Sequence, residues 1–181
     1  MKLSFLSALL LLVVSATAQQ GATTVKWLTH KDSAYGLSIQ YPSNWQLKPP
    51  NANARFFITS YPESDADNFR ENLNCIVPSP VKKGVTLKAA VEDINNTLSG
   101  NLSGFELVHS GYSTWNGVNS YEIEYVCTQT SGENTYELHM LQKIMILKGK
   151  LYALTFTSLT ESYDKYIGDI RRMIQSFKVN G

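Results

Sequence analysis

Four side chains able to act as acids, bases or metal ligands are predicted to share one face of a β-hairpin: Glu122 and Glu124 on the first strand, and Glu137 and His139 on the second. Carboxylate oxygens and imidazole nitrogens bind zinc and related cations. Zinc, however, favours about four ligands at near-tetrahedral angles, and one imidazole among carboxylates splayed along flat strands is a poor set. Lys143 lies opposite Glu122 in the predicted register, which indicates charge pairing. We therefore interpret these residues as a solvent-exposed or helix-covered polar sheet face, with a metal site as the weaker alternative.

The remaining histidines show no catalytic pattern. His30 lies near the N-terminus and His109 lies in a predicted strand, and no sequence signal joins either residue to a nucleophile. The chain has no G-x-S-x-G elbow, and neither cysteine belongs to a Cys/His signature. The sequence therefore predicts no catalytic residue and no cofactor. An active site assembled from residues distant in the sequence stays open, because catalytic geometry is spatial.

The two cysteines, Cys75 and Cys127, each lie in an alternating strand pattern. In an oxidising compartment paired thiols tend to form disulfides. Free cysteine is also among the most buried residue types, so two separate core thiols are the favoured interpretation. A disulfide between them stays open, because the sequence alone does not bring their Cα atoms within about 7 Å.

The hairpin that carries the polar face is defined by its turn. If Gly132 and Glu133 are the two central turn residues, Tyr125 lies opposite Met140 and Glu122 opposite Lys143. This register makes one face mostly apolar and pairs opposite charges on the other. Burial and charge therefore favour the same register.

The other elements follow from hydrophobic periodicity. Thr86 can cap a helix whose apolar side chains recur at 3.6-residue spacing until Gly100, and a second helix begins near Glu161. Asn116-Gly117 is a strong hairpin turn. The predicted strands cover residues 37–41, 56–61, 72–77, 105–115, 118–128, the strand after Gly132, and 151–158. The sequence thus predicts an α+β fold with an antiparallel sheet of about seven strands covered by helices.

The first residues have the pattern of an export signal. Lys2 is followed by an apolar run and by the small residues Ala16-Thr17-Ala18, so residues 1–18 are predicted to be a cleaved signal peptide. Cleavage there would expose Gln19 and leave no lipid-bearing cysteine, so we expect a periplasmic or extracellular protein without a membrane anchor. Residues 19–34 are predicted to be a loose segment, and residues 35–181 a single domain.

The charge balance bears on two classes of partner, nucleic acids and anionic membranes. Removal of residues 1–18 takes away Lys2, so the 16 basic and 15 acidic residues become 15 and 15. A balanced charge offers no long-range attraction to nucleic acid or to an anionic membrane surface.

With its elements in this order, the chain resembles the PsbP-like family, which includes bacterial extracytoplasmic proteins, DcrB and the photosystem-associated PsbP proteins. The resemblance covers nearly the whole chain after the signal peptide. It rests on five stretches in order, at residues 35–45, 68–74, 104–108, 116–125 and 152–157. It implies an α/β/α sandwich around an antiparallel sheet, in a family known mainly for binding and assembly roles.

The function we expect is that of an exported, non-enzymatic module that binds a protein or an envelope component. One alternative is a carrier of a small ligand, which would need a cleft of roughly 300 Å³ or more between helix and sheet. Another is a hydrolase, which would need His109 or His139 near a hydroxyl, thiol or carboxylate in a concave site.

Overall fold

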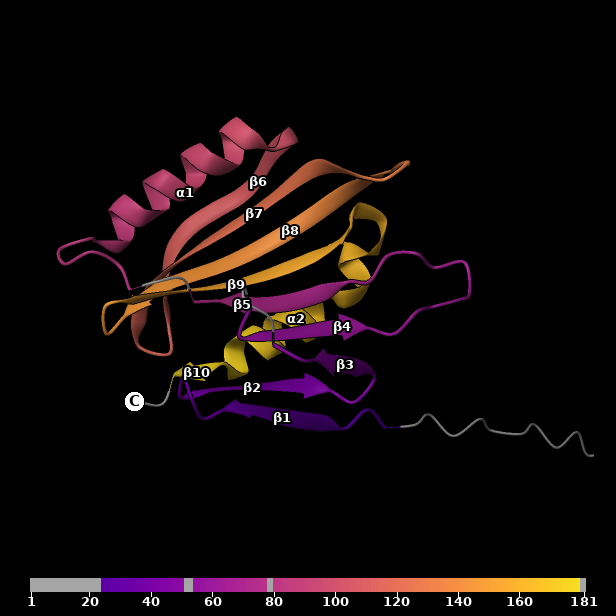
Figure 1. The fold of residues 1–181 in the computed structure, drawn as a ribbon, viewed down its shortest axis with the longest axis horizontal. Coiled ribbons are helices and arrows are strands. Elements are labelled where there is room, and N and C mark those ends of the chain that lie inside the picture. Colours follow the sequence, from indigo (N-terminus) through magenta and orange to yellow (C-terminus); the bar gives the residue numbers. More distant parts are fainter. Residues whose placement is uncertain (1–23, 51–53, 78–79, 180–181) are drawn as a thin grey trace, which may run out of the picture.

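The computed structural model describes residues 24–50, 54–77 and 80–179. Its main layer is an antiparallel sheet of seven strands in the order β3-β4-β5-β9-β8-β7-β6 (Figure 1). These strands are β3 (Trp45–Lys48), β4 (Phe56–Ser60), β5 (Asn72–Ile76), β6 (Ser103–Trp115), β7 (Val118–Ser131), β8 (Asn134–Leu147) and β9 (Lys150–Leu159). The predicted α+β class with about seven antiparallel strands and covering helices is confirmed.

Helix α1 (Leu87–Asn101) covers one face of this sheet (Figure 1). Thr86 is its N-cap, as predicted, because the Thr86 hydroxyl accepts a hydrogen bond of 3.2 Å from the amide of Ala89. Val91 is the buried residue of the helix. It belongs to a core cluster with the alternate side chains that β7 and β8 turn to this side: Tyr121, Ile123, Tyr125, Cys127, Leu138 and Ile144.

The opposite face of the sheet carries helix α2 (Tyr163–Ser176), which follows a short 3-10 turn, η1 (Thr160–Ser162). A three-stranded sheet packs beside α2, in the order β1-β2-β10. Its strands are β1 (Trp27–Asp32), β2 (Leu37–Pro42) and β10 (Lys178–Val179). Trp115 closes this larger core, because its indole N–H donates to the carbonyl of Ile174 at 3.0 Å and its ring stacks on Phe177.

Part of the prediction for the N-terminal region was wrong. Residues 19–34 were expected to be loose, yet Trp27–Asp32 forms β1, in which all six residues pair with β2. Trp27 also lies under the guanidinium of Arg172, 3.9 Å from the ring centroid, which ties the strand to α2. The expected signal peptide, residues 1–18, and residues 19–23 lie outside the described residues.

The membership of the main sheet also differs from the prediction. The strand expected at residues 37–41 is β2, which belongs to the small sheet, and β3 (Trp45–Lys48) takes a place in the large one. Pro42 ends β2, and the chain then turns into β3 because Trp45 is buried in the core beside Tyr166. The α/β/α sandwich is therefore a seven-stranded sheet with one helix on each face and a second small sheet beside α2.

The β7–β8 hairpin has the predicted register. Tyr125 pairs with Met140 and Glu122 with Lys143, across a turn at Gly132 and Glu133. The alternation then places Glu122 on the α2 side of the sheet and Tyr125 on the α1 side. This register positions the polar residues that the sequence singled out.

Candidate functional site

The predicted polar face is a cluster of paired charges between the sheet and α2. We call it the Glu122 cluster: Glu122, Glu124, His139, Lys143 and Arg171. The ammonium group of Lys143 lies 3.2 Å from Glu122, and Nε2 of His139 lies 2.9 Å from Glu124. Arg171 of α2 reaches both carboxylates, at 3.4 Å and 3.8 Å. Two carboxylates thus face the basic side chains of Lys143 and Arg171 within 4 Å.

The surroundings of His139 hold its ring in place. It stacks on Tyr163 of α2 with centroids 3.5 Å apart and rings 6° from parallel. Burial raises the pKa of the Tyr163 hydroxyl, and the charge of Glu124 raises it further. Tyr163 therefore stays protonated and supplies no negative charge. The imidazole is fixed by a carboxylate on one edge and by an aromatic face below it.

Glu137 does not join this cluster. The side chain of Glu137 is exposed. Its backbone carbonyl accepts a hydrogen bond of 3.3 Å from the hydroxyl of Thr160. Across the described residues, no group of three His, Cys, Asp or Glu side chains has an arrangement that could hold a metal ion. Within the Glu122 cluster, each carboxylate instead pairs with basic side chains of the same fold.

The hydrolase alternative requires His109 or His139 beside a reactive group in a concave site. His139 does meet a carboxylate, that of Glu124, but neither residue lines the described cavities of 230–360 Å³. His109 is exposed on β6, and His30 packs against Phe56 in the core around the small sheet.

The cysteines are free, buried and on opposite faces of the sheet. Cys75 lies in the core beside α2, whereas Cys127 lies in the core beneath α1. Burial raises the pKa of each thiol, so both stay protonated at neutral pH. A disulfide between them would have to cross the sheet.

A second site, which the sequence reading missed, lies at the end of the sheet where the β4–β5 loop meets the start of β8 and the end of β9. A pocket of about 350 Å³ opens there. Four acidic residues line it and no basic residue does: Glu63, Asp67, Glu71 and Glu161. We call it the acidic pocket. Three of these residues come from one loop with the sequence Glu63-Ser64-Asp65-Ala66-Asp67, followed by Glu71, and this density of acids was the signal available in the sequence.

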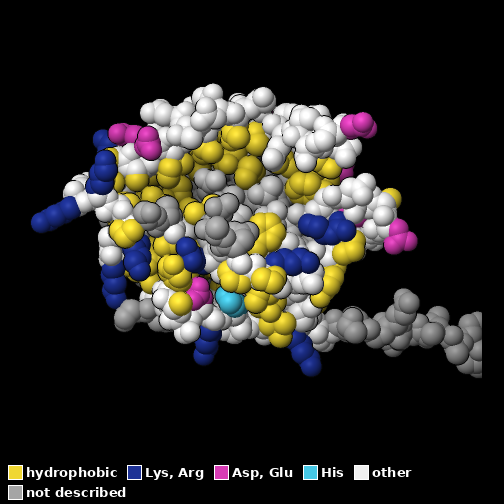
Figure 2. Space-filling view, viewed as in Figure 1, with side chains coloured by type: hydrophobic (Ala, Val, Ile, Leu, Met, Phe, Trp, Pro, Cys, Tyr) yellow, Lys and Arg dark blue, Asp and Glu magenta, His cyan; other side chains and the backbone are white. Residues whose placement is uncertain are grey.

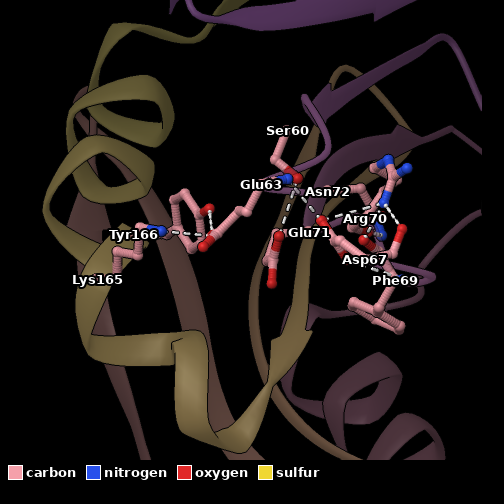
Figure 3. A network of polar contacts seen from close by, with 9 residues as sticks. All are labelled: Ser60, Glu63, Asp67, Phe69, Arg70, Glu71, Asn72, Lys165 and Tyr166. Carbon is pink, nitrogen blue, oxygen red and sulfur yellow. Dashed lines mark hydrogen bonds and ion pairs between the residues drawn. The ribbon is translucent and has the colours of Figure 1, made fainter. Parts of the chain in front are cut away.

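Two of the four carboxylates are held by neighbouring groups (Figure 3). Glu63 meets Lys165 and the hydroxyl of Tyr166, both from α2. The hydrogen bond from Lys165 lowers the pKa of Glu63 most, and that from Tyr166 adds to it. Asp67 accepts the amide of Glu63 at 2.9 Å, which is the main cause of its lowered pKa. Both carboxylates are therefore ionised at neutral pH.

Glu71 differs from these two. Glu71 is 4 % exposed, and one of its carboxylate oxygens accepts a hydrogen bond of 2.8 Å from the hydroxyl of Ser60. Among the described residues, the other oxygen has no hydrogen-bond partner and no cation pairs with Glu71. Phe69 and Tyr136, whose ring centroids lie 5.5 Å apart, form part of the pocket wall. Glu71 meets Ser60 on the face of the sheet that carries α2, whereas Phe69 and Tyr136 pack against the core beneath α1.

Two apolar features complete the surface. A groove of about 360 Å³ lies between the start of α1, the segment before it and Leu151 of β9. Figure 2 shows hydrophobic side chains gathered between α1 and the sheet on this face. The other feature is the sheet edge at β6, where Leu107, Val108 and Tyr112 are 52 %, 52 % and 58 % exposed. In the described structure β6 pairs with β7 alone, so its outer edge is open.

Comparison with known proteins agrees with this architecture. The family model described as PsbP matches residues 26–179, which includes both sheets and both helices. The chain belongs to the PsbP family. A search of curated proteins finds no match. No helix in the described parts of this PsbP-family chain is long and apolar enough to cross a bilayer.

Solved structures show the same fold in several bacteria. The cyanobacterial PsbP (CyanoP) of Synechocystis sp. PCC 6803 is 20% identical, with a TM-score of 0.62 over 88% of this chain and 96% of that one. PA94 of Pseudomonas aeruginosa, a protein of unknown function, is 11% identical, with a TM-score of 0.62 over 86% and 98%. LpqN of Mycobacterium tuberculosis, described as involved in cell envelope biogenesis, is 12% identical, with a TM-score of 0.57 over 87% and 92%. At these identities the likeness establishes the fold.

Proposed function

We propose that this PsbP-family chain is an exported, non-enzymatic module that contacts a protein or another envelope component through the open edge of β6. The observation that carries the proposal is the exposure of three large apolar side chains, Leu107, Val108 and Tyr112, along a 13-residue strand with a free edge. Exposed backbone donors and acceptors at such an edge accept a further strand. Apolar side chains beside them supply the burial that stabilises a complex.

The pairing of β6 with β7 is irregular, which restricts what can bind to its outer edge. Two register shifts interrupt the pairing of β6 with β7, between Ser103 and Glu106 and between Leu107 and His109. Irregularities of this kind limit uncontrolled edge-to-edge aggregation, because they twist the strand and break its hydrogen-bonding pattern. A partner strand would pair along the regular stretch from His109 to Trp115, and Leu107 and Val108, at the register shift beside this stretch, would pack against it.

Site-specific photocrosslinking tests this proposal. A photoreactive phenylalanine analogue replaces Tyr112 in one variant and Leu28 in a control, because Leu28 is 42 % exposed on β1 in the other sheet. The proposal expects a reproducible crosslinked product in the native envelope fraction from position 112 and not from position 28. Changing both Leu107 and Val108 to threonine should weaken that product. Equal products from both positions, or background alone at good expression, would contradict it.

Export has its own test. N-terminal sequencing of the protein recovered from the envelope or the medium should begin at Gln19, the residue after the predicted cleavage site. An intact Met1 in a cytoplasmic fraction would remove the export part of the proposal and leave the β6 contact to be judged separately.

The groove below α1 favours a second candidate function, that of a small-ligand carrier. It lies between helix and sheet, and its volume of about 360 Å³ falls within the range of small-molecule sites. Ala90 lines the groove, so Ala90→Leu should reduce the binding of an apolar fluorescent probe. Gly100→Ala, near the other end of α1 in open space, is the matched control. Equal probe binding by both variants and the parent protein would count against the carrier.

A further inference from the structure

The β6 edge lacks the lysine that each of the other outer strands carries. In the described structure the other outer strands are β1 and β10 of the small sheet and β3 of the large one, and they contain Lys31, Lys178 and Lys48. A lysine on an edge strand opposes pairing with a second molecule. β6 contains no lysine or arginine, and its regular stretch from His109 to Trp115 contains no acidic residue either. Two copies of this stretch can therefore approach each other without repulsion between like charges.

The regular stretch is also centred on the most exposed apolar side chain of the edge. Tyr112 lies at the middle of His109–Trp115 and is 58 % exposed. If two copies pair antiparallel about a two-fold axis through this position, Tyr112 lies opposite Tyr112, and Ser110 lies opposite Thr114. Tyr112 pairs with Tyr121 of the α1 core, so by alternation Ser110, Tyr112 and Thr114 all lie on the α1 face of the sheet. Side chains opposite each other thus share a face, as antiparallel pairing requires.

This pairing would also cover the exposed apolar side chains beside the regular stretch. Leu107 and Val108, each 52 % exposed, come directly before it. In the two-fold arrangement they lie next to the β6–β7 turn of the other copy, at Asn116 and Gly117. The space around Gly117 is open, because a Cβ added there would meet nothing within 4 Å. Each copy would therefore bury Leu107, Val108 and Tyr112 against the other, which supplies the hydrophobic driving force of an association.

We propose that the partner at the β6 edge is a second copy of this chain, paired antiparallel about a two-fold axis at Tyr112, so that the two large sheets become one continuous sheet. This inference rests on the proposed function, because it names the protein that the edge contacts. The two-fold contact uses the β6 edge of both copies, so assembly stops at a dimer. The register shift between Leu107 and His109 ends the regular pairing on one side, and the β6–β7 turn ends it on the other.

Sedimentation velocity of the purified protein tests the association, which should appear as a concentration-dependent equilibrium between monomer and dimer. Tyr112→Lys places two ammonium groups opposite each other at the axis and should weaken the dimer about tenfold or more. Leu28→Lys makes the same change in charge at a 42 % exposed residue of β1 and should leave the equilibrium unchanged. Tyr112→Glu should also weaken the dimer. An equimolar mixture of Tyr112→Lys and Tyr112→Glu should restore it, because opposite charges then face each other.

Cysteine crosslinking tests the register. Under mild oxidation, Ser110→Cys and Thr114→Cys chains should form a disulfide when they are mixed, because the two positions lie opposite each other. Neither variant alone should crosslink, because its two cysteines would lie four residues apart along the paired strands, about 13 Å, which is too far for a disulfide. Cys75 and Cys127 are buried and do not compete. This measurement still decides the register if the Tyr112 variants fail to fold.

The outcomes distinguish this inference from the proposed function. A dimer that Tyr112→Lys weakens and that gives the mixed disulfide supports both. A monomer at every concentration, with a photocrosslinked product from position 112 whose mass is not twice that of the chain, overturns the second copy and leaves the β6 contact standing. A dimer that resists Tyr112→Lys, or that gives no mixed disulfide, overturns the pairing at this edge. A monomer with no product from position 112 contradicts both.

Discussion

Replacing Lys143 by methionine should destabilise the protein by about 2–3 kcal/mol. Lys143 is 8 % exposed, and its ammonium group donates to Glu122 at 3.2 Å and to the hydroxyl of Ser113 at 2.8 Å. Methionine keeps most of the aliphatic stem, so the main loss is a charge-assisted hydrogen bond worth about 1.5–3 kcal/mol. Glu122 keeps Arg171 at 3.4 Å, which holds the cost below the roughly 3–5 kcal/mol of a buried charge left without a partner.

Urea denaturation followed by tryptophan fluorescence measures this change, and a double-mutant cycle with Glu122→Gln isolates the pair. The two substitutions should be non-additive by about 1 kcal/mol or more, because each removes the same contact. Arg171→Met is the control, since this side chain is 53% exposed and its loss should cost less than about 1 kcal/mol. A loss below about 0.5 kcal/mol for Lys143→Met, or simple additivity, would refute the view that the Glu122 cluster holds the fold together.

Three further changes test other parts of the structure. Thr86→Ala should cost about 1 kcal/mol in urea denaturation, because it removes the N-cap of α1, and Thr86→Ser should recover most of it. Gly104→Ala should cost about 1–3 kcal/mol in the same assay, because the residue has φ +61° and an added Cβ would lie 2.9 Å from the hydroxyl of Thr128. A urea denaturation curve unchanged from that of the parent protein would contradict this. Because the pKa values of Cys75 and Cys127 are raised, the native state keeps protons that the unfolded thiols lose above about pH 8.5. The free energy of unfolding should therefore fall as the pH rises from 8 to 10, by up to about 1.4 kcal/mol per pH unit for each thiol. A double Cys→Ala variant should lose this part of the pH dependence.

Local sequence patterns predicted the β7–β8 hairpin and the start of α1, because in both places local and tertiary preferences agree. The turn at Gly132 and Glu133 determined the β7–β8 register, and with it the Glu122–Lys143 pair. Thr86 predicted the start of α1. In each case a single residue with a special conformation or a capping side chain sets the boundary, and the alternation that follows from it decides which side chains meet.

The second sheet was missed for the opposite reason. β1 has the burial pattern of a half-exposed strand, with little alternation, and it forms because β2 and α2 lie beside it. β10 has two residues, and its pairing with β2 joins positions about 140 residues apart in the sequence. Periodicity within a short window carries no information on such contacts, because the hydrogen bonds that define the strand are supplied by a distant segment.

The two polar sites differ in the same way. The Glu122 cluster could be predicted because one hairpin register assembles most of it, and its charges are paired within the fold. The acidic pocket needs the β4–β5 loop, the start of β8 and η1 together, so no single register predicts it. Its buried carboxylate also lacks the internal cation that each acid of the Glu122 cluster has. Glu71 is 4 % exposed and accepts its hydrogen bond from Ser60, a contact across the β4–β5 loop that joins residues no local pattern connects.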